Sequence, residues 1–203
     1  MRPAWLIILH VCILLLGGSV YGSAQTISGT VHKAGSGERL PWVAVWVEPL
    51  DSHPPFSPPA EPAVMEQRHI AFVPPLLPIL VGTRVLFPNH DTVYHNIYSL
   101  SRPKQFNLGL YKPGEEKSVV FDKPGVIKVF CNIHDSMQAI ILVLETPYFT
   151  VTDPQGNYTL SGFPPGTYLL RTWHKTLRGS PRRVEIGKGQ KQRIDLLLSD
   201  QEQ

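Results

Sequence analysis

The chain has 203 residues, a formal net charge of +3 and 42% hydrophobic residues, so it can form one large or two small domains with a real core. Its 19 basic and 16 acidic residues are nearly balanced and form no dense basic cluster. This composition argues against nucleic-acid binding and against any other polyanionic partner.

The first 24 residues have the pattern of a secretory signal peptide. Arg2 gives a charged start, an apolar run covers residues 4–16, and Gly22 and Ala24 are small residues suited to cleavage after about Ala24. The alternative is a membrane anchor, but this run is short for a bilayer span and no later segment is apolar enough. We therefore expect a periplasmic or secreted protein without stable membrane insertion after cleavage.

Cleavage of the signal would leave a single cysteine. Cys12 lies in the signal, and Cys131 is the other cysteine of the chain. Exported proteins usually pair their cysteines as disulfides, so a lone thiol must be buried, paired between chains or bound to a metal. His134 and Met137 follow Cys131 closely. Their proximity favours the metal.

Short alternating apolar runs separated by Gly, Pro, Asn and Asp turns predict β-strands along the whole mature chain. No segment shows a helical period with caps, so the predicted class is all-β. The expected strands are residues 27–31, 42–47, 70–73, 80–87, 95–100, 117–121, 126–130, 139–144, 148–151, 158–160, 168–173, 184–186 and 194–198.

Prolines interrupt this pattern in two places. Residues 49–62 hold six prolines, which predicts an extended linker without helix. Pro74, Pro75 and Pro78 predict an irregular, edge-like path before the strand at 80–87.

The residues with the most specific chemistry are His95 and the run Cys131-x-x-His134-x-x-Met137. Two imidazoles, a thiolate and a distant thioether are the ligands of a blue-copper electron-transfer site. Imidazole suits Cu(II) and the sulfur ligands suit Cu(I), so a rigid arrangement of both serves each oxidation state. Zinc is an alternative, although structural zinc sites favour more cysteines and do not use methionine. Met137 could also be an ordinary core residue.

These residues, with Gly82-Thr83-x-Val85-x-Phe87-x-Asn89 upstream, resemble the cupredoxins and are most similar to amicyanin and plastocyanin-like proteins. The resemblance implies a Greek-key β-sandwich holding one copper ion, which cycles between Cu(I) and Cu(II), on His95, Cys131, His134 and Met137. It implies that Asn96 links the ligand-bearing segments by hydrogen bonds. It also implies that His134 is a surface electron port, with Pro74, Pro75, Leu76 and Leu77 supplying part of an apolar patch. Asp135 stands where family members often have proline, which leaves the reduction potential open.

Segments on both sides of the copper motif resemble a second family. Gly29-Thr30-Val31 with Val43-Ala44-Val45, and later Thr152-Asp153-x-x-Gly156-x-Tyr158, are similar to the carboxypeptidase regulatory-like β-sandwich of transthyretin (prealbumin) type. The combination resembles exported bacterial proteins labelled methylamine-utilisation or plastocyanin-like. We expect the cupredoxin-like domain to be inserted in, or packed on, this split sandwich. The expected boundaries are 1–24 signal peptide, 25–50 first strands of the regulatory-like sandwich, 51–66 Pro-rich linker, 67–145 copper domain and 146–203 remainder of the regulatory-like sandwich.

The remaining histidines carry weaker expectations. His90 is expected in a loop and His69 at the surface, while His32 and His53 have no chemical partners nearby in sequence. Trp173-His174 is expected at a corner of the second sandwich, with a second electron port as the alternative.

Enzyme activity finds little support in the sequence. A Cys–His nucleophile pair needs an orienting acid, and Asp135, directly after His134, is poorly placed for that. The chain has none of the His-x-His motifs that multicopper oxidases use. We therefore expect a protein that is not an enzyme and carries electrons between a redox-protein donor and acceptor. The alternative is a copper-binding, copper-storage or cell-surface binding module without electron transfer.

Overall fold

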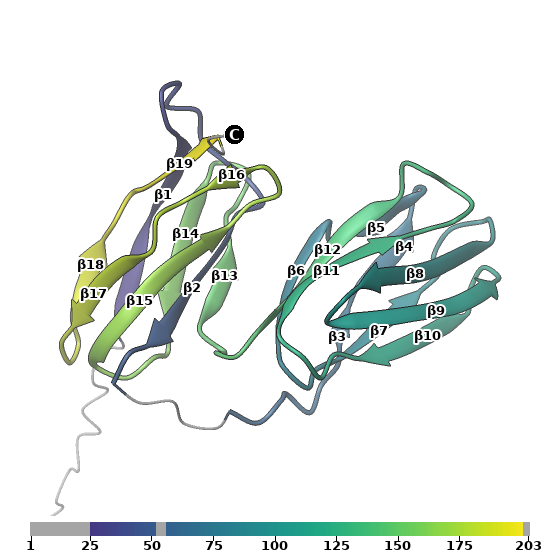
Figure 1. The fold of residues 1–203 in the computed structure, drawn as a ribbon, viewed down its shortest axis with the longest axis horizontal. Helices are drawn as coiled ribbons and strands as arrows, with labels where there is room; N and C mark the ends of the chain where they lie inside the picture. The colour runs from purple at the N-terminus through teal and green to yellow at the C-terminus, as the bar shows by residue number, and fades with distance from the viewer. Residues whose placement is uncertain (1–24, 52–55, 201–203) are drawn as a thin grey trace, which may run out of the picture.

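A computed structural model describes residues 25–51 and 56–200 of the chain. All regular secondary structure in these residues is β-strand, apart from isolated bridges and turns, which confirms the all-β prediction. Figure 1 shows the strands as two β-sandwiches side by side. We call them the terminal sandwich, built from both ends of the described chain, and the central sandwich, built from the middle.

The terminal sandwich encloses a core that runs from Ile27 to Leu198 in sequence. Its two sheets each combine early and late strands, so neither part of the chain completes a sheet alone. One sheet has the order β14 (Asn157–Ser161), β1 (Thr26–Lys33), β19 (Leu196–Asp200) and β16 (Leu177–Arg178), with β18 (Lys191–Arg193) also on β1. The other has the order β13 (Phe149–Val151), β2 (Ala44–Pro49), β15 (Gly166–Trp173) and β17 (Arg182–Ile186).

The central sandwich encloses a separate core that includes Cys131 and Met137. Its larger sheet has the order β6 (Leu76–Leu80), β12 (Gln138–Leu144), β11 (Gly125–Phe130), β8 (His95–Ser101) and β9 (Lys104–Tyr111). Its smaller sheet has the order β10 (Glu116–Val120), β7 (Arg84–Pro88) and β3 (Ala63–Val64), and β4 (Glu66–Arg68) pairs with β5 (Ala71–Val73).

Strand β12 is apolar on both faces because each face meets a different core. Ala139, Ile141 and Val143 point into the central core, whereas Ile140, Leu142 and Leu144 belong to a third cluster between the sandwiches. Successive side chains of a strand point to opposite faces, so one strand can serve two layers. The terminal sandwich contributes Ala44 and Trp46 of β2, with Phe149, Val151 and Trp173 beside them.

The strand predictions differ from the structure at the edges of sheets. Strands β3, β4, β9, β16 and β18 were not expected. The Pro-rich segment at 74–78 leads into β6, which pairs only with β12 and is therefore an edge strand that tolerates Pro78. Within the range expected to be a linker, 51–66, residues 63–66 belong to β3 and β4 or lie between them, and Met65 is fully buried in the central core.

Candidate metal centre

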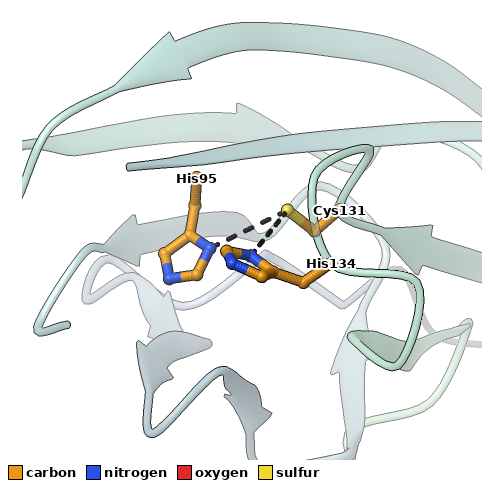
Figure 2. Close-up of side chains that lie close together, drawn as sticks. All are labelled: His95, Cys131 and His134. Atoms are coloured by element: carbon orange, nitrogen blue, oxygen red, sulfur yellow. Dashed lines mark hydrogen bonds between the residues drawn. The ribbon is translucent and has the colours of Figure 1, made fainter. Parts of the chain in front are cut away.

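Three side chains from two segments of the central sandwich, β8 and the loop between β11 and β12, meet at one end of its larger sheet. His95 begins β8, Cys131 directly follows β11, and His134 lies in the turn before β12. One ligand atom from each lies within 4.8 Å of the others, and Figure 2 shows the two imidazoles beside the thiol sulfur. Among the described residues, no other group of three His, Cys, Asp or Glu side chains comes this close together.

The loop that carries Cys131 and His134 is held by its own backbone. Phe130 and Gln138 pair across β11 and β12, which closes the base of the loop. Inside it, the Cys131 N–H donates to the Met137 carbonyl at 3.2 Å, and the Met137 N–H donates to the His134 carbonyl at 2.9 Å. The spacing of Cys131, His134 and Met137 therefore fits a tight, hydrogen-bonded turn between two strands.

The distances within the cluster fit a shared metal ion. The Cys131 sulfur is 3.8 Å from Nδ1 of His95 and 3.9 Å from Nδ1 of His134. Bonds of about 2.05 Å to nitrogen and about 2.3 Å to sulfur, as in zinc proteins, separate the two ligand atoms by about 3.8 Å at an angle of roughly 120°. Each imidazole nitrogen therefore lies at the distance from the thiol sulfur that a shared metal ion with near-trigonal bond angles requires.

Asp91 fixes the imidazole of His95 from the side away from the thiol. Its Oδ2 lies 2.8 Å from Nε2 of His95, which is fully buried. A carboxylate accepts at this nitrogen, so Nε2 carries the ring proton and Nδ1 presents its lone pair toward Cys131. Hydrogen bonds of this kind orient metal-binding histidines and raise their basicity.

The Asp91 carboxylate is itself held by backbone donors. The N–H groups of His69 and Ile70 donate to its two oxygens at 2.5 and 3.0 Å, and both residues have left-handed backbone conformations. Burial raises the pKa of Asp91, but the hydrogen bonds from His95, Ile70 and His69 outweigh it and leave the pKa lowered. Asp91 was not among the residues expected at the site. Its position four residues before His95 in a loop was the available signal.

Met137 closes the loop that carries Cys131 and His134, through backbone hydrogen bonds to both residues. Its side chain is 1% exposed and belongs to the same core as Cys131. Cys131 is also buried and forms no disulfide. A buried free thiol next to two imidazoles is shielded from solvent oxidants.

Asn96 does not make the link that the sequence resemblance implied. Its Nδ2 donates to Oδ1 of Asn107 at 2.9 Å, so it ties β8 to β9 and not to the loop after Cys131. Its own Oδ1 is buried and has no hydrogen-bond partner among the described residues.

Two of the residues expected in an apolar patch around His134 lie elsewhere. Leu76 is buried between the sandwiches and Leu77 packs on the central core, so neither extends a surface around His134. Exposed apolar side chains close in sequence to His95 or His134 are those of Val93, Tyr94 and Ile133, and Ile70, whose N–H donates to Asp91, is also exposed. His134 itself is half-buried, in contrast to His95.

The other histidines lie outside this cluster. Nδ1 of His90 is 2.7 Å from the Glu66 carboxylate at the surface, and His69 is exposed. Nδ1 of His174 accepts hydrogen bonds from the backbone of Thr176 and Leu177, so it caps a turn of the terminal sandwich as the corner interpretation predicts. His32 contacts the Thr30 hydroxyl at 2.7 Å, and His53 lies outside the described residues.

Comparisons with known proteins find similarity only among solved structures. No family model and no curated protein matches the chain. A purple cupredoxin from Nitrosopumilus maritimus is 29% identical with a TM-score of 0.37, over 40% of this chain and 99% of that one. A Cu-containing nitrite reductase from Thermus scotoductus SA-01 is 28% identical with a TM-score of 0.41, over 49% of this chain and only 26% of that one. A reduced Cu(I) form of an amicyanin mutant is 19% identical with a TM-score of 0.39, over 49% of this chain and 98% of that one.

Proposed function

We propose that this chain is an exported blue-copper protein that carries single electrons between redox proteins, with His95, Cys131, His134 and Met137 as copper ligands. The observation that carries the proposal is the buried thiol of Cys131, with an imidazole nitrogen at 3.8 Å and another at 3.9 Å. Two imidazoles and a thiolate in a trigonal arrangement, with a methionine close by, are the donors of blue-copper sites. When bound, copper supplies a reversible one-electron couple, Cu(I)/Cu(II).

The residues of the chain would make electron transfer fast by holding the ligands still. His95 is fixed by Asp91, and the loop of Cys131 and His134 is fixed by its internal hydrogen bonds. Rigid ligands change little between two oxidation states, so little reorganisation accompanies the transfer of an electron. His134 is less buried than His95 and Cys131, which supports a role as the contact point for partners.

Electron transfer is also a better match to the cluster than catalysis. Among the described residues it is the only close group of potential ligands, and nothing beside it resembles the further copper sites of a multicopper oxidase. We therefore propose that the chain is not an enzyme, although a copper enzyme, the nitrite reductase, is among the similar structures.

The second sandwich and the export of the protein are parts of the same proposal. We assign the terminal sandwich to the carboxypeptidase regulatory-like type, with the copper domain inserted between its first strands and the remainder. We also propose that residues 1–24 are a signal peptide and that the mature protein is periplasmic or secreted. Within the described residues, no helix has the length and apolar character needed to cross a membrane.

A redox titration of the copper-loaded protein tests the proposed function. We expect one reversible one-electron transition that requires Cys131, with the same copper content before and after repeated cycles. Copper that binds stoichiometrically but is lost on reduction, or that shows no reversible transition, would instead support the alternative of copper storage.

A further inference from the structure

A pocket lies at the junction of the two sandwiches, beside the base of the loop that carries Cys131 and His134, here called the copper loop. It has a volume of about 350 Å³, which is in the range of small-molecule sites. Its walls come from both sandwiches, and the residues that line it are Pro75, Lys128, Phe130, Gln138, Ala139, Ile140, Trp173, Lys175 and Thr176.

The central sandwich supplies one wall through the outer face of β11 and β12. Lys128 pairs with Ile140, and Phe130 pairs with Gln138. These four neighbouring residues lie on the face of the sheet that points away from the central core. The Phe130 ring is also packed on Tyr98, with 5.8 Å between centroids. Ile140 and Trp173 connect the pocket to the apolar cluster between the sandwiches, whose residues Leu142 and Leu144 lie farther along β12.

The terminal sandwich supplies the opposite wall through Trp173 at the end of β15 and the residues that follow it. Trp173 packs on the cluster between the sandwiches but stays partly exposed. Two aromatic rings, one from each sandwich, thus line the pocket. Large aromatic surfaces of this kind favour flat aromatic ligands.

The charge of the pocket is one-sided. Lys128 and Lys175 line it, no carboxylate does, and neither lysine forms a salt bridge with any described residue. Lys175 Nζ donates to Oε1 of Gln138 at 3.1 Å, which leaves the Gln138 amide N–H groups free to donate to a ligand. The pocket therefore offers hydrogen-bond donors and positive charge, which are complementary to an anion.

A neighbouring pocket of about 490 Å³ shares Pro75, Ile140, Trp173, Lys175 and Thr176 with the first. Its far part is lined by Glu38 and Asp200, beside Lys33. The acidic groups lie at the end away from Phe130 and Lys128. An anionic group is therefore favoured at the end next to the copper loop.

From these observations we propose that the junction pocket binds a small, planar aromatic anion, with its ring between Phe130 and Trp173 and its charge at Lys128 and Lys175. The site goes beyond the proposed electron-transfer function and does not depend on it. The pocket would give the terminal sandwich a role in ligand binding, because neither sandwich alone forms both walls. Since Phe130 is bonded directly to Cys131, an occupant would lie one residue from the proposed copper ligand.

The test is a nuclear magnetic resonance titration of the copper-free, ¹⁵N-labelled protein with naphthalene-2-sulfonate. We expect saturable shifts of the Trp173 indole N–H and of the Phe130 and Gln138 amides. The Lys128→Gln/Lys175→Gln double variant should bind about tenfold more weakly, since two exposed charge pairs are lost. The matched control, Lys188→Gln/Lys191→Gln, removes two exposed lysines elsewhere on the terminal sandwich and should bind as the unmodified protein does.

The proposal is overturned if no saturable shift occurs, if the shifts centre on Ile133 and His134, or if the cation naphthalen-2-ylmethylammonium binds equally well. Because the titration uses copper-free protein, its outcome is independent of whether the protein carries electrons. A pocket that binds the anion in a protein without copper redox activity would leave this inference standing and remove the proposed function.

Discussion

The carboxylate of Asp91 lies 2.8 Å from Nε2 of His95, on the opposite side of the ring from the Cys131 thiol. This contact determines which nitrogen of His95 faces the other ligands. It also places a negative charge close to the proposed copper ion. Carboxylate–histidine pairs of this kind strengthen metal binding.

Replacing Asp91 by asparagine should weaken Cu(II) binding by about 10- to 100-fold. An amide has a single acceptor oxygen, so it cannot serve His95 and the backbone donors of His69 and Ile70 together. Competition with a chelator of known affinity measures the change. Glu145→Gln is the matched control, because Glu145 is exposed, follows β12 at the end away from the loop of Cys131 and His134, and its side chain forms no hydrogen bond or ion pair among the described residues. Equal affinities for the two variants would contradict a role for Asp91 in orienting His95.

Met137→Leu separates an axial ligand from a core residue. The exchange conserves volume, so the free energy of unfolding of the copper-free protein should change by less than about 1.5 kcal/mol. If the sulfur is a copper ligand, its loss leaves three donors, and a three-coordinate site favours Cu(I) over Cu(II) whatever the softness of the donor removed, so the reduction potential should rise. Met65→Leu is the control, since Met65 is fully buried in the same core but is not a proposed ligand. Equal potentials in both variants would make Met137 a core residue only.

Leu142→Ala tests whether the two sandwiches stabilise each other. Leu142 is 4% exposed and lies in the cluster between them, so the truncation should cost about 3 kcal/mol of unfolding free energy in urea. Leu100→Ala, on β8 of the same sandwich, removes a side chain that is 74% exposed and should change stability by less than about 0.5 kcal/mol. Similar small effects for both leucines would show that the interface contributes little.

Much of the fold could be predicted from the sequence because most of its strands are short apolar runs between turn residues. The run at 139–144 was recognisable as a strand, but its continuous apolar character did not reveal that Ile140 and Leu142 face another sandwich. Strand β9 was missed because it lies at the edge of its sheet, where Phe106 and Leu108 are only partly buried and Gly109 interrupts the alternation.

The candidate site was predictable to the extent that its chemistry is local. Cys131, His134 and Met137 lie on one turn, and their spacing alone placed them together. Asp91 was not predictable in this way, because its role depends on a loop that turns back toward His95 and on backbone donors from residues 69 and 70. Leu76 was misassigned to the surface for the same reason. Its environment is set by contact with β2 and β13, whose residues are distant in sequence.

The visible absorption spectrum of the mature protein loaded with Cu(II), recorded beside a Cys131→Ser variant, tests the central claim most directly. The account predicts an intense blue thiolate-to-copper band that is absent from the variant and is bleached reversibly by a reductant. A colourless or weakly absorbing protein, or a band that survives in the Cys131→Ser variant, would contradict the assignment of a blue-copper site.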